Sequence, residues 1–145
     1  MFGSSKKKKE TFNHPLMGEL QFQGVWLGRI ECMIYNFSSI ITLIIYVDED
    51  FKDDFTVQER SYIYYRDNMD KINAEVRAVL LETYDIEELS GLQDRFEPTS
   101  FIINQNGDCA FSFRDKEEPR GFSSAQIVVT VTPSVGYFGS EDDYI

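Results

Sequence analysis

Apolar and polar residues alternate with a helical period in one long stretch of the chain, residues 56–84. The apolar and aromatic positions recur at steps of three and four: Tyr62, Tyr65, Met69, Ile72, Val76 and Val79. This spacing places them on one stripe of an α-helix and leaves the polar residues opposite. The pattern therefore predicts a long helix that buries one face. A ligand-stacking site built from Tyr62, Tyr64 and Tyr65 is the alternative, but helical spacing favours packing.

Two capping patterns predict the ends of the helical region. Thr56 and Glu59 fit a capping box, in which the Thr hydroxyl accepts from a backbone N–H and the Glu reaches back. Residues 85–88 repeat the pattern, so we expect a second short helix that Ser90 and Gly91 end. A helix over residues 57–84 would be about 42 Å long. This length suggests a kink or a later start near Ser61.

Segments with the two-residue period of strands flank the helix on both sides. Before it, residues 11–20 predict a short strand, a turn bracketed by Pro15 and Gly18, and the start of a second strand that continues to residue 23. Further strands are expected near residues 25–34 and 40–47, with a bulge or bend at Gly28. Residues 40–47 are apolar on both faces, which is typical of a central strand. After the helix, Asn106 and Gly107 predict a hairpin between residues 100–105 and 108–114. Residues 125–132 form the last predicted strand.

These elements predict an α+β fold in the order β-β-β-α-β-β-β. We expect a mainly antiparallel, curved sheet of about six strands, with one long central helix packed on one face. The length of 145 residues suits one domain. Residues 1–10 are expected to be a flexible basic N-terminus, residues 11–133 the α+β domain, and residues 134–145 an acidic and aromatic C-terminal tail.

Composition and charge narrow the classes of partner. The chain is 42% hydrophobic and carries a net charge of −11, so it should be globular and should repel nucleic-acid phosphates. The run Lys6–Lys9 lacks the interleaved aromatic residues of single-strand binders. The longest apolar run is much shorter than the roughly 20 residues that span a bilayer. We therefore expect no nucleic acid and no membrane as partner, and a cytoplasmic, reducing location in which Cys32 and Cys109 are buried thiols.

The sequence gives little support for catalysis. No phosphate-binding loop, zinc-protease motif or nucleophile elbow is present, and the one histidine, His14, cannot make a His-rich metal site. Residues 48–59 place Asp48, Asp50 and Asp54 at calcium-loop positions, but Lys52 and Asp53 stand where a ligand and the turn glycine are needed. We expect no catalytic residue, no cofactor and no metal, although carboxylate pairs can also form between distant segments.

The best candidate for an interaction surface is the acidic segment before the long helix. It carries five carboxylates within seven residues: Asp48, Glu49, Asp50, Asp53 and Asp54. Negative charge is favoured at a helix N-terminus. The same charge would steer a basic protein toward this segment, so we expect these five residues to bind a basic protein partner.

Several structural motifs resemble those of a loose group of bacterial domains of unknown function, several of which look like immunity proteins of polymorphic toxin systems. The motifs cover most of the chain: Phe12, His14, Pro15, Gly18 and Leu20, then Trp26 and Gly28, Asn68 and Asn73 in the helix, and Pro98 before the hairpin. The resemblance implies the α+β fold and a bacterial origin. It carries over no functional residue.

Three hypotheses about function stay open at this point. The first is a non-catalytic binding protein, in its most specific form an immunity-type inhibitor of a basic toxin. The second is a small-molecule-binding protein or enzyme with a pocket between sheet and helix. The third is a self-associating structural module, a homo-oligomer that pairs through the uncovered face of its sheet.

Overall fold

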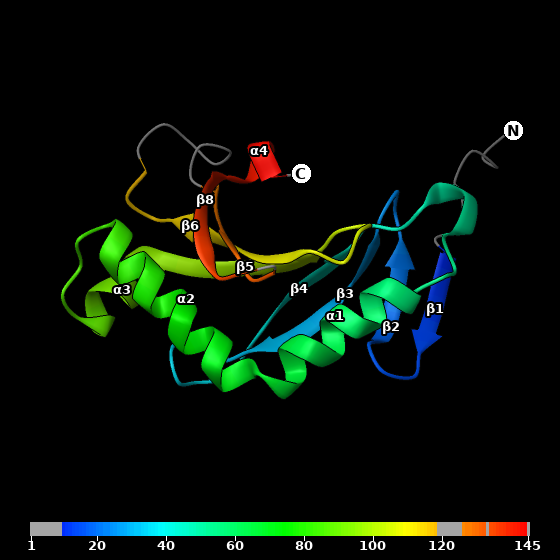
Figure 1. Cartoon of the computed structure of the whole chain (residues 1–145), viewed down its shortest axis with the longest axis horizontal. Coiled ribbons are helices and arrows are strands. Elements are labelled where there is room, and N and C mark those ends of the chain that lie inside the picture. The colour runs from blue at the N-terminus through cyan, green and yellow to red at the C-terminus, as the bar shows by residue number, and fades with distance from the viewer. Residues whose placement is uncertain (1–9, 119–125, 133, 145) are drawn as a thin grey trace, which may run out of the picture.

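One sheet of eight strands organises the part of the chain that the computed structural model describes, residues 10–118, 126–132 and 134–144. The strands are β1 (Glu10–His14), β2 (Gly18–Phe22), β3 (Trp26–Cys32), β4 (Ser39–Ile45), β5 (Phe96–Ile103), β6 (Cys109–Asp115), β7 (Gln126–Thr130) and β8 (Gly136–Ser140). Helices α1 (Thr56–Asp67), α2 (Met69–Thr83) and α3 (Leu89–Arg95) lie between β4 and β5, and α4 (Glu141–Tyr144) ends the described chain. Figure 1 shows this arrangement. The basic run Lys6–Lys9, residues 119–124 and the first residue of the last predicted strand, residue 125, lie outside the described residues.

Neighbours in the sheet follow the order of the sequence, from β1 to β8. Within the described strands, β4 and β5 pair in parallel and every other neighbouring pair is antiparallel. The parallel pair follows from the helices, because a crossover connection returns the chain to the same end of the sheet. The predicted α+β class with a mainly antiparallel sheet is confirmed. The expected number of about six strands is too low, because the described chain has eight. They include the β1–β2 hairpin, whose turn at Pro15 and Gly18 the sequence predicts, and β8 from the tail.

The helical region is two helices with a break at Asn68. This residue has φ −120°, and its side-chain amide donates to the carbonyl of Tyr64 at 2.9 Å. The bond competes with the helical ladder at the C-terminus of α1. The helical region is therefore not one continuous helix, and the kink that its predicted length suggested is present as this break. The predicted stripe is correct in position: Tyr65, Ile72, Val76 and Leu80 are buried, and Tyr62, Met69, Val79 and Tyr84 pack against the core.

Neither helix end follows its predicted capping pattern, although α1 starts close to the predicted position and a short helix, α3, follows α2 as expected. Thr56 is already the first residue of α1, and its hydroxyl donates to Oδ1 of Asp54 at 2.6 Å. Glu59 does not reach the helix start, because it binds His14. Ser90 and Gly91 lie inside α3, where the next residue, Leu92, is completely buried. The burial of Leu92 against the core explains why the helix continues past two residues that commonly end one.

Gly28 lies within an unbroken ladder between β3 and β4, opposite Leu43, so the predicted bulge is absent. A Cβ atom at Gly28 would lie 2.6 Å from Cδ2 of Leu20 and 3.3 Å from the carbonyl oxygen of Glu19. The glycine therefore makes room for Leu20 of β2, which is fully buried. The sequence therefore marks Gly28 correctly as a special position, but the glycine is needed for packing between strands and not for an unusual backbone conformation.

Replacing Gly28 by alanine should lower the free energy of unfolding by about 1–3 kcal/mol, because the added methyl overpacks the contact with Leu20. Gly136→Ala is the matched control, because the nearest atom to its added Cβ would be Thr130 Oγ1, at 3.7 Å. Urea denaturation of both variants measures the difference. Equal stability of the two variants would contradict the packing explanation.

The two faces of the sheet are covered unequally. Helices α1 to α3 lie against one face, and α4 lies on the other side, next to β7 and β8 (Figure 1). On that second side, Ile102, Ala110 and Val128 are completely buried, and the Ser112 hydroxyl donates to Glu141 of α4. Outward-facing residues of β3 and β4 are instead exposed: Arg29, Glu31, Ile40 and Thr42. The second face is therefore open to solvent over β3 and β4.

Cys32 and Cys109 are buried free thiols, as the sequence predicts. Burial raises the pKa of the Cys109 thiol to about 11 and moves that of Cys32 in the same direction. Among the described helices, none has the length and apolar character needed to cross a membrane.

The raised thiol pKa values predict alkaline destabilisation. An unfolded cysteine has a pKa of about 8.5, so the folded chain holds these protons more tightly above that pH. The resulting stability is complete below about pH 8.5 and should be lost as pH rises toward the folded pKa of Cys109, about 11. Guanidinium denaturation between pH 7 and 11 measures the fall. A Cys109→Ala variant should show a shallower decline, and an identical decline would contradict the assignment to Cys109.

Candidate functional site

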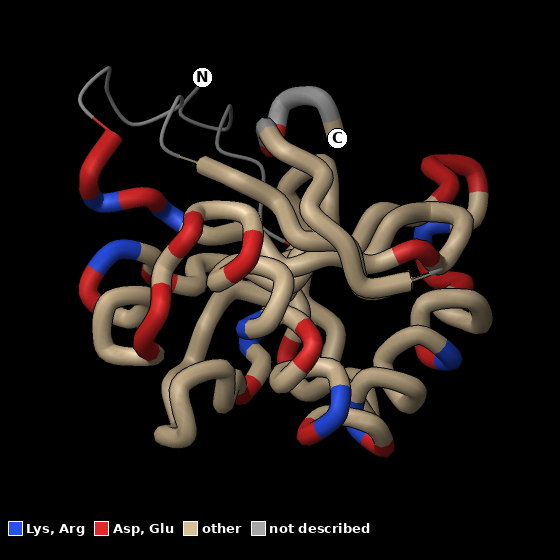
Figure 2. The backbone as a smooth tube through the Cα atoms, turned by 60° about the vertical axis from the view of Figure 1, so that its left-hand side comes forward, with Lys and Arg blue, Asp and Glu red and all other residues tan. Residues whose placement is uncertain are grey.

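The acidic turn, residues 48–54, carries the five carboxylates that the sequence singles out. It connects β4 to α1 and contains a short 3-10 turn, Glu49–Phe51. Asp48, Glu49, Asp50, Asp53 and Asp54 are all exposed. Figure 2 shows the acidic residues of this turn gathered at the upper right of the molecule. The turn brings all five predicted residues together on one protruding segment.

Hydrogen bonds within the acidic turn fix its local shape. The Asp48 carboxylate accepts from the backbone N–H of Asp50 at 2.9 Å. Asp54 accepts from both the hydroxyl and the backbone N–H of Thr56, and these bonds hold the pKa of Asp54 below its usual value. Asp54 thus binds the first residue of α1, whereas the N-cap residue, Phe55, makes no side-chain cap bond. The carboxylates of Glu49, Asp50 and Asp53 make no such local bond in the described structure.

A buried tryptophan anchors the acidic turn to the sheet. Nε1 of Trp26 donates to the carbonyl oxygen of Lys52 at 2.9 Å, and Trp26 is only 1% exposed. The Lys52 ammonium pairs with Glu10 and lies 4.8 Å from the ring centroid of Phe22. The one cation of the turn is therefore directed back to β1 and β2. The carboxylates are left to face solvent on a segment that is already ordered.

Phe51 lies in the middle of the acidic turn and is 68% exposed, the highest value among the large apolar side chains described as exposed. Val57 at the start of α1 and Phe12 of β1 are also exposed, at 40% and 42%. Exposed aromatic residues are enriched among the residues that dominate binding energy at protein interfaces. Our sequence reasoning missed Phe51, although an aromatic residue flanked by carboxylates was the available signal.

His14 is held in a structural position. Its Nδ1 accepts from the backbone N–H groups of Leu16 and Met17 at 3.0 and 3.1 Å. Its Nε2 lies 2.7 Å from the Glu59 carboxylate, and the side chain is 4% exposed. Because Nδ1 accepts twice, the ring proton is on Nε2. His14 closes the turn between β1 and β2 and ties it to α1, which occupies both ring nitrogens.

Metal-ligating side chains do not converge in the part of the chain that the structure describes. No group of three or more His, Cys, Asp or Glu residues there is placed to hold a metal ion. The carboxylates of the acidic turn are thus close in sequence without forming such a cage.

A second concave feature, the strand cleft, lies where β4 and β5 separate. Their parallel ladder begins only at Thr42 and Ser100, so the residues before it diverge. The strand cleft has two adjoining hollows of about 380 and 500 Å³, which share Ile40, Ile41, Glu97 and Pro98. Sequence reasoning missed it, because the strand pattern did not show that β4 and β5 are neighbours.

The Tyr35 side chain helps to hold the strand cleft open. Its hydroxyl donates to the carbonyl oxygen of Phe96 at 2.6 Å, in a buried contact. This main-chain acceptor at the start of β5 is therefore satisfied by a side chain rather than by β4. Burial raises the pKa of the Tyr35 hydroxyl above its usual value, so it remains a donor at neutral pH. The strands can stay apart without leaving the Phe96 carbonyl unsatisfied.

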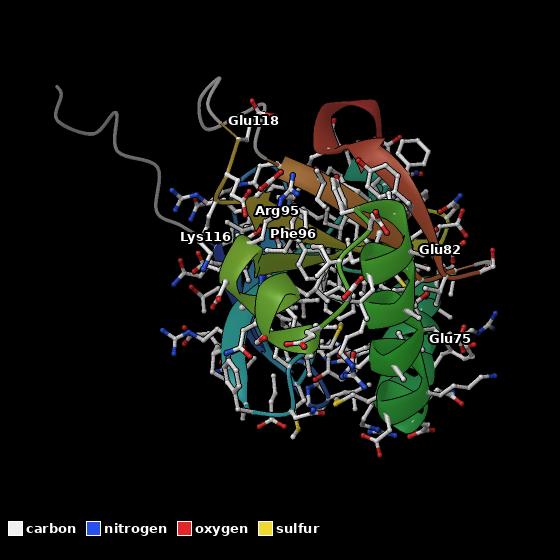
Figure 3. The ribbon with its side chains drawn as sticks, turned by 90° about the vertical axis from the view of Figure 1, so that its left-hand side faces the viewer. Glu75, Glu82, Arg95, Phe96, Lys116 and Glu118 are labelled. Carbon is white, nitrogen blue, oxygen red and sulfur yellow. The ribbon has the colours of Figure 1, made fainter. Side chains whose placement is uncertain are left out.

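An ion pair supports the same end of the molecule. The Arg95 guanidinium forms two hydrogen bonds of 3.0 Å with the Asp115 carboxylate. It also lies 4.8 Å from the ring centroid of Tyr84 and 4.9 Å from that of Phe96. Figure 3 shows Arg95, Phe96 and Lys116 beside one another where α3 leads into β5. These contacts fix the wall of the strand cleft that β5 provides.

Comparison with known proteins gives no indication of function, so a functional proposal has to rest on the geometry of the chain. Searches of protein-family models, of curated proteins and of solved structures found no match to this chain.

Proposed function

We propose that the protein is a non-catalytic binding protein whose acidic turn captures a basic protein partner. Its most specific form is an immunity-type inhibitor that covers the cationic surface of a toxin. The observation that carries the proposal is the exposed Phe51 ring set among five exposed carboxylates on an anchored turn. An apolar anchor surrounded by charge of one sign fits a basic surface that has an apolar depression.

Charge and rigidity make complementary contributions to this binding. The net charge of −11 and the local carboxylates would accelerate the encounter with a cationic partner. The contacts of Lys52 with Trp26 and Glu10 order the turn before binding. A segment that is ordered in advance loses less conformational entropy in the complex, which favours affinity.

The surroundings of His14, which could act as a base, and of Cys109, which could act as a nucleophile, support a role without catalysis. Both ring nitrogens of His14 are engaged in structural contacts. Burial keeps the pKa of the Cys109 thiol near 11, so at neutral pH it is protonated and a poor nucleophile. Binding through the acidic turn requires neither group.

The test is affinity capture from the native host with two matched charge variants. Glu49→Gln/Asp50→Asn/Asp53→Asn removes three charges from the acidic turn and leaves the structural carboxylates of Asp48 and Asp54 unchanged. Glu75→Gln/Glu82→Gln/Glu87→Gln removes three charges elsewhere; Figure 3 shows Glu75 and Glu82 on α2. Wild type and the control should recover a basic protein that the acidic-turn variant loses.

Association kinetics with the captured partner give the quantitative readout. The acidic-turn variant should bind about tenfold or more slowly at low salt, and its rate should depend less on ionic strength. Phe51→Ala should mainly accelerate dissociation, because an apolar anchor acts after the encounter. Failure to recover any basic partner, or equal kinetics for the acidic-turn variant and its control, would reject the proposal.

A further inference from the structure

We propose that the strand cleft is a self-association surface, and that its occupant is the same region of a second copy of this chain. The surface lies on the part of the sheet that neither α1 to α3 nor α4 covers. It is independent of the acidic turn and of the partner proposed above.

The shape of the strand cleft is self-complementary. Phe37 and Ile40 line it and are 49% and 61% exposed, large values for apolar side chains. The Phe37 ring lies 6.5 Å from the ring of Tyr35, which is itself buried. A projecting apolar group therefore stands next to a hollow lined by Tyr35, Phe96 and Pro98. A twofold axis would place the projecting group of each copy in the hollow of the other, the arrangement that an isologous interface requires.

The charges around the strand cleft favour a second copy over other occupants. The charged residues that line it are Arg29, Lys116 and Glu97, and Glu31 lies opposite Ile40 in the ladder between β3 and β4. Positive and negative side chains are balanced in number there, whereas the whole chain carries a net charge of −11. Two copies repel each other over most of their surfaces and can approach where charge is balanced. The acidic turn, with five carboxylates and one lysine, cannot pair with itself in this way.

The start of β4 also faces the strand cleft ahead of its ladder with β5. The N–H of Tyr46 donates to the carbonyl of Ile103 on β5. Because alternate residues of a strand direct their N–H and C=O to the same side, Ile44, Thr42 and Ile40 also face β5. The β4–β5 ladder starts at Thr42, so the main-chain groups of Ile40 face the hollow. Strand edges of this kind commonly pair with another chain.

The geometry leaves the acidic turn accessible in such a dimer. The strand cleft lies at the start of β4 and the acidic turn follows its end, and seven residues of strand span about 23 Å. Figure 1 shows the start of β5 and the acidic turn at opposite ends of the long axis. A dimer through the strand cleft would therefore present two acidic turns, pointing away from the contact.

The test is the mass in solution, measured by sedimentation equilibrium and light scattering over a range of concentrations. Wild type should show twice the chain mass of 16.9 kDa at high concentration. Ile40→Lys should raise the dimer dissociation constant by about thirtyfold or more, because it places a charge in the apolar centre of the contact. Phe37→Ser, which removes the projecting ring, should weaken the dimer in the same direction.

Ile63→Lys is the matched control, since Ile63 is 38% exposed and lies on α1. It should dimerise as wild type does, and circular dichroism should show all three variants folded. A wild-type mass of one chain at the highest soluble concentration would overturn the inference. A dimer that tolerates Ile40→Lys and Phe37→Ser as well as Ile63→Lys would overturn it too, because the contact would then lie elsewhere. Neither result depends on the basic partner.

Discussion

Replacing Arg95 by alanine should lower the free energy of unfolding by about 3 kcal/mol, mainly because Asp115 is left without its cation. The Asp115 side chain is 8% exposed and that of Arg95 26%, so the pair is shielded from water although its arginine reaches the surface. The paired carboxylate raises the pKa of the Arg95 guanidinium, which remains charged at any relevant pH. The substitution removes two hydrogen bonds of 3.0 Å and the contacts of the guanidinium with two aromatic rings.

Two further variants separate charge from geometry at this position. Arg95→Lys keeps the charge but loses the planar fork and the stacking on Tyr84 and Phe96, so it should recover less than half of the loss. Arg95→Met/Asp115→Asn removes both charges and should be more stable than Arg95→Ala alone, because no buried charge remains unpaired. Denaturant titration measures all three. Full recovery by Arg95→Lys would show that charge alone matters here.

Replacing Gly107 by alanine should also cost about 3 kcal/mol, from two separate causes. Gly107 has φ +93°, where a side chain costs about 1–2 kcal/mol. An added Cβ would also lie 2.8 Å from Cγ1 of Val57 and 3.2 Å from Oγ of Ser61, which adds about 1–3 kcal/mol of overpacking. The hairpin and the N-terminal half of α1 should therefore be destabilised together, because the Ser61 hydroxyl donates to the Gly107 carbonyl.

A double variant distinguishes the two causes. Val57→Ala removes the atom nearest to the new methyl, and Val57 is 40% exposed, so this change alone should cost little. In Gly107→Ala/Val57→Ala the packing part of the loss should be recovered and the backbone part should remain. The measurement is a double-mutant cycle by urea denaturation. Strict additivity of the two substitutions would mean that Val57 does not restrain position 107.

The hairpin at Asn106 and Gly107 shows what local sequence can specify. The Asn-Gly pair and the alternating residues on each side predict a hairpin, and β5 and β6 form one. The strands meet at Ile103 and Cys109, so the turn takes residues 104–108 instead of the two residues that the pattern indicates. The contact of Gly107 with α1 depends on residues about 50 positions away, which no local pattern reports. The same holds for Gly28, where the pattern marks a special position but only the packing of Leu20 explains it.

The two candidate sites also differ in how far the sequence alone reveals them. The acidic turn is visible in the sequence because its carboxylates are consecutive and precede a helix. The exposure of Phe51 required the structure, because Trp26, 26 residues before Lys52, fixes how the turn is presented. The strand cleft depends on β4 and β5, which are neighbours in the sheet although about 50 residues separate them.

The sequence by itself determined the period of each element, the buried stripe of the helices, the central hairpin and the acidic character of the chain. These features depend on side-chain order over a few residues, which local sterics and the hydrophobic effect convert into structure directly. Tertiary structure decided the continuation of α3 past Gly91, the close contact of Gly28 with Leu20, the pairing of β4 with β5 and the strand cleft. Each of these is a competition between local preference and contacts with distant residues, and the larger contact energy decides the outcome.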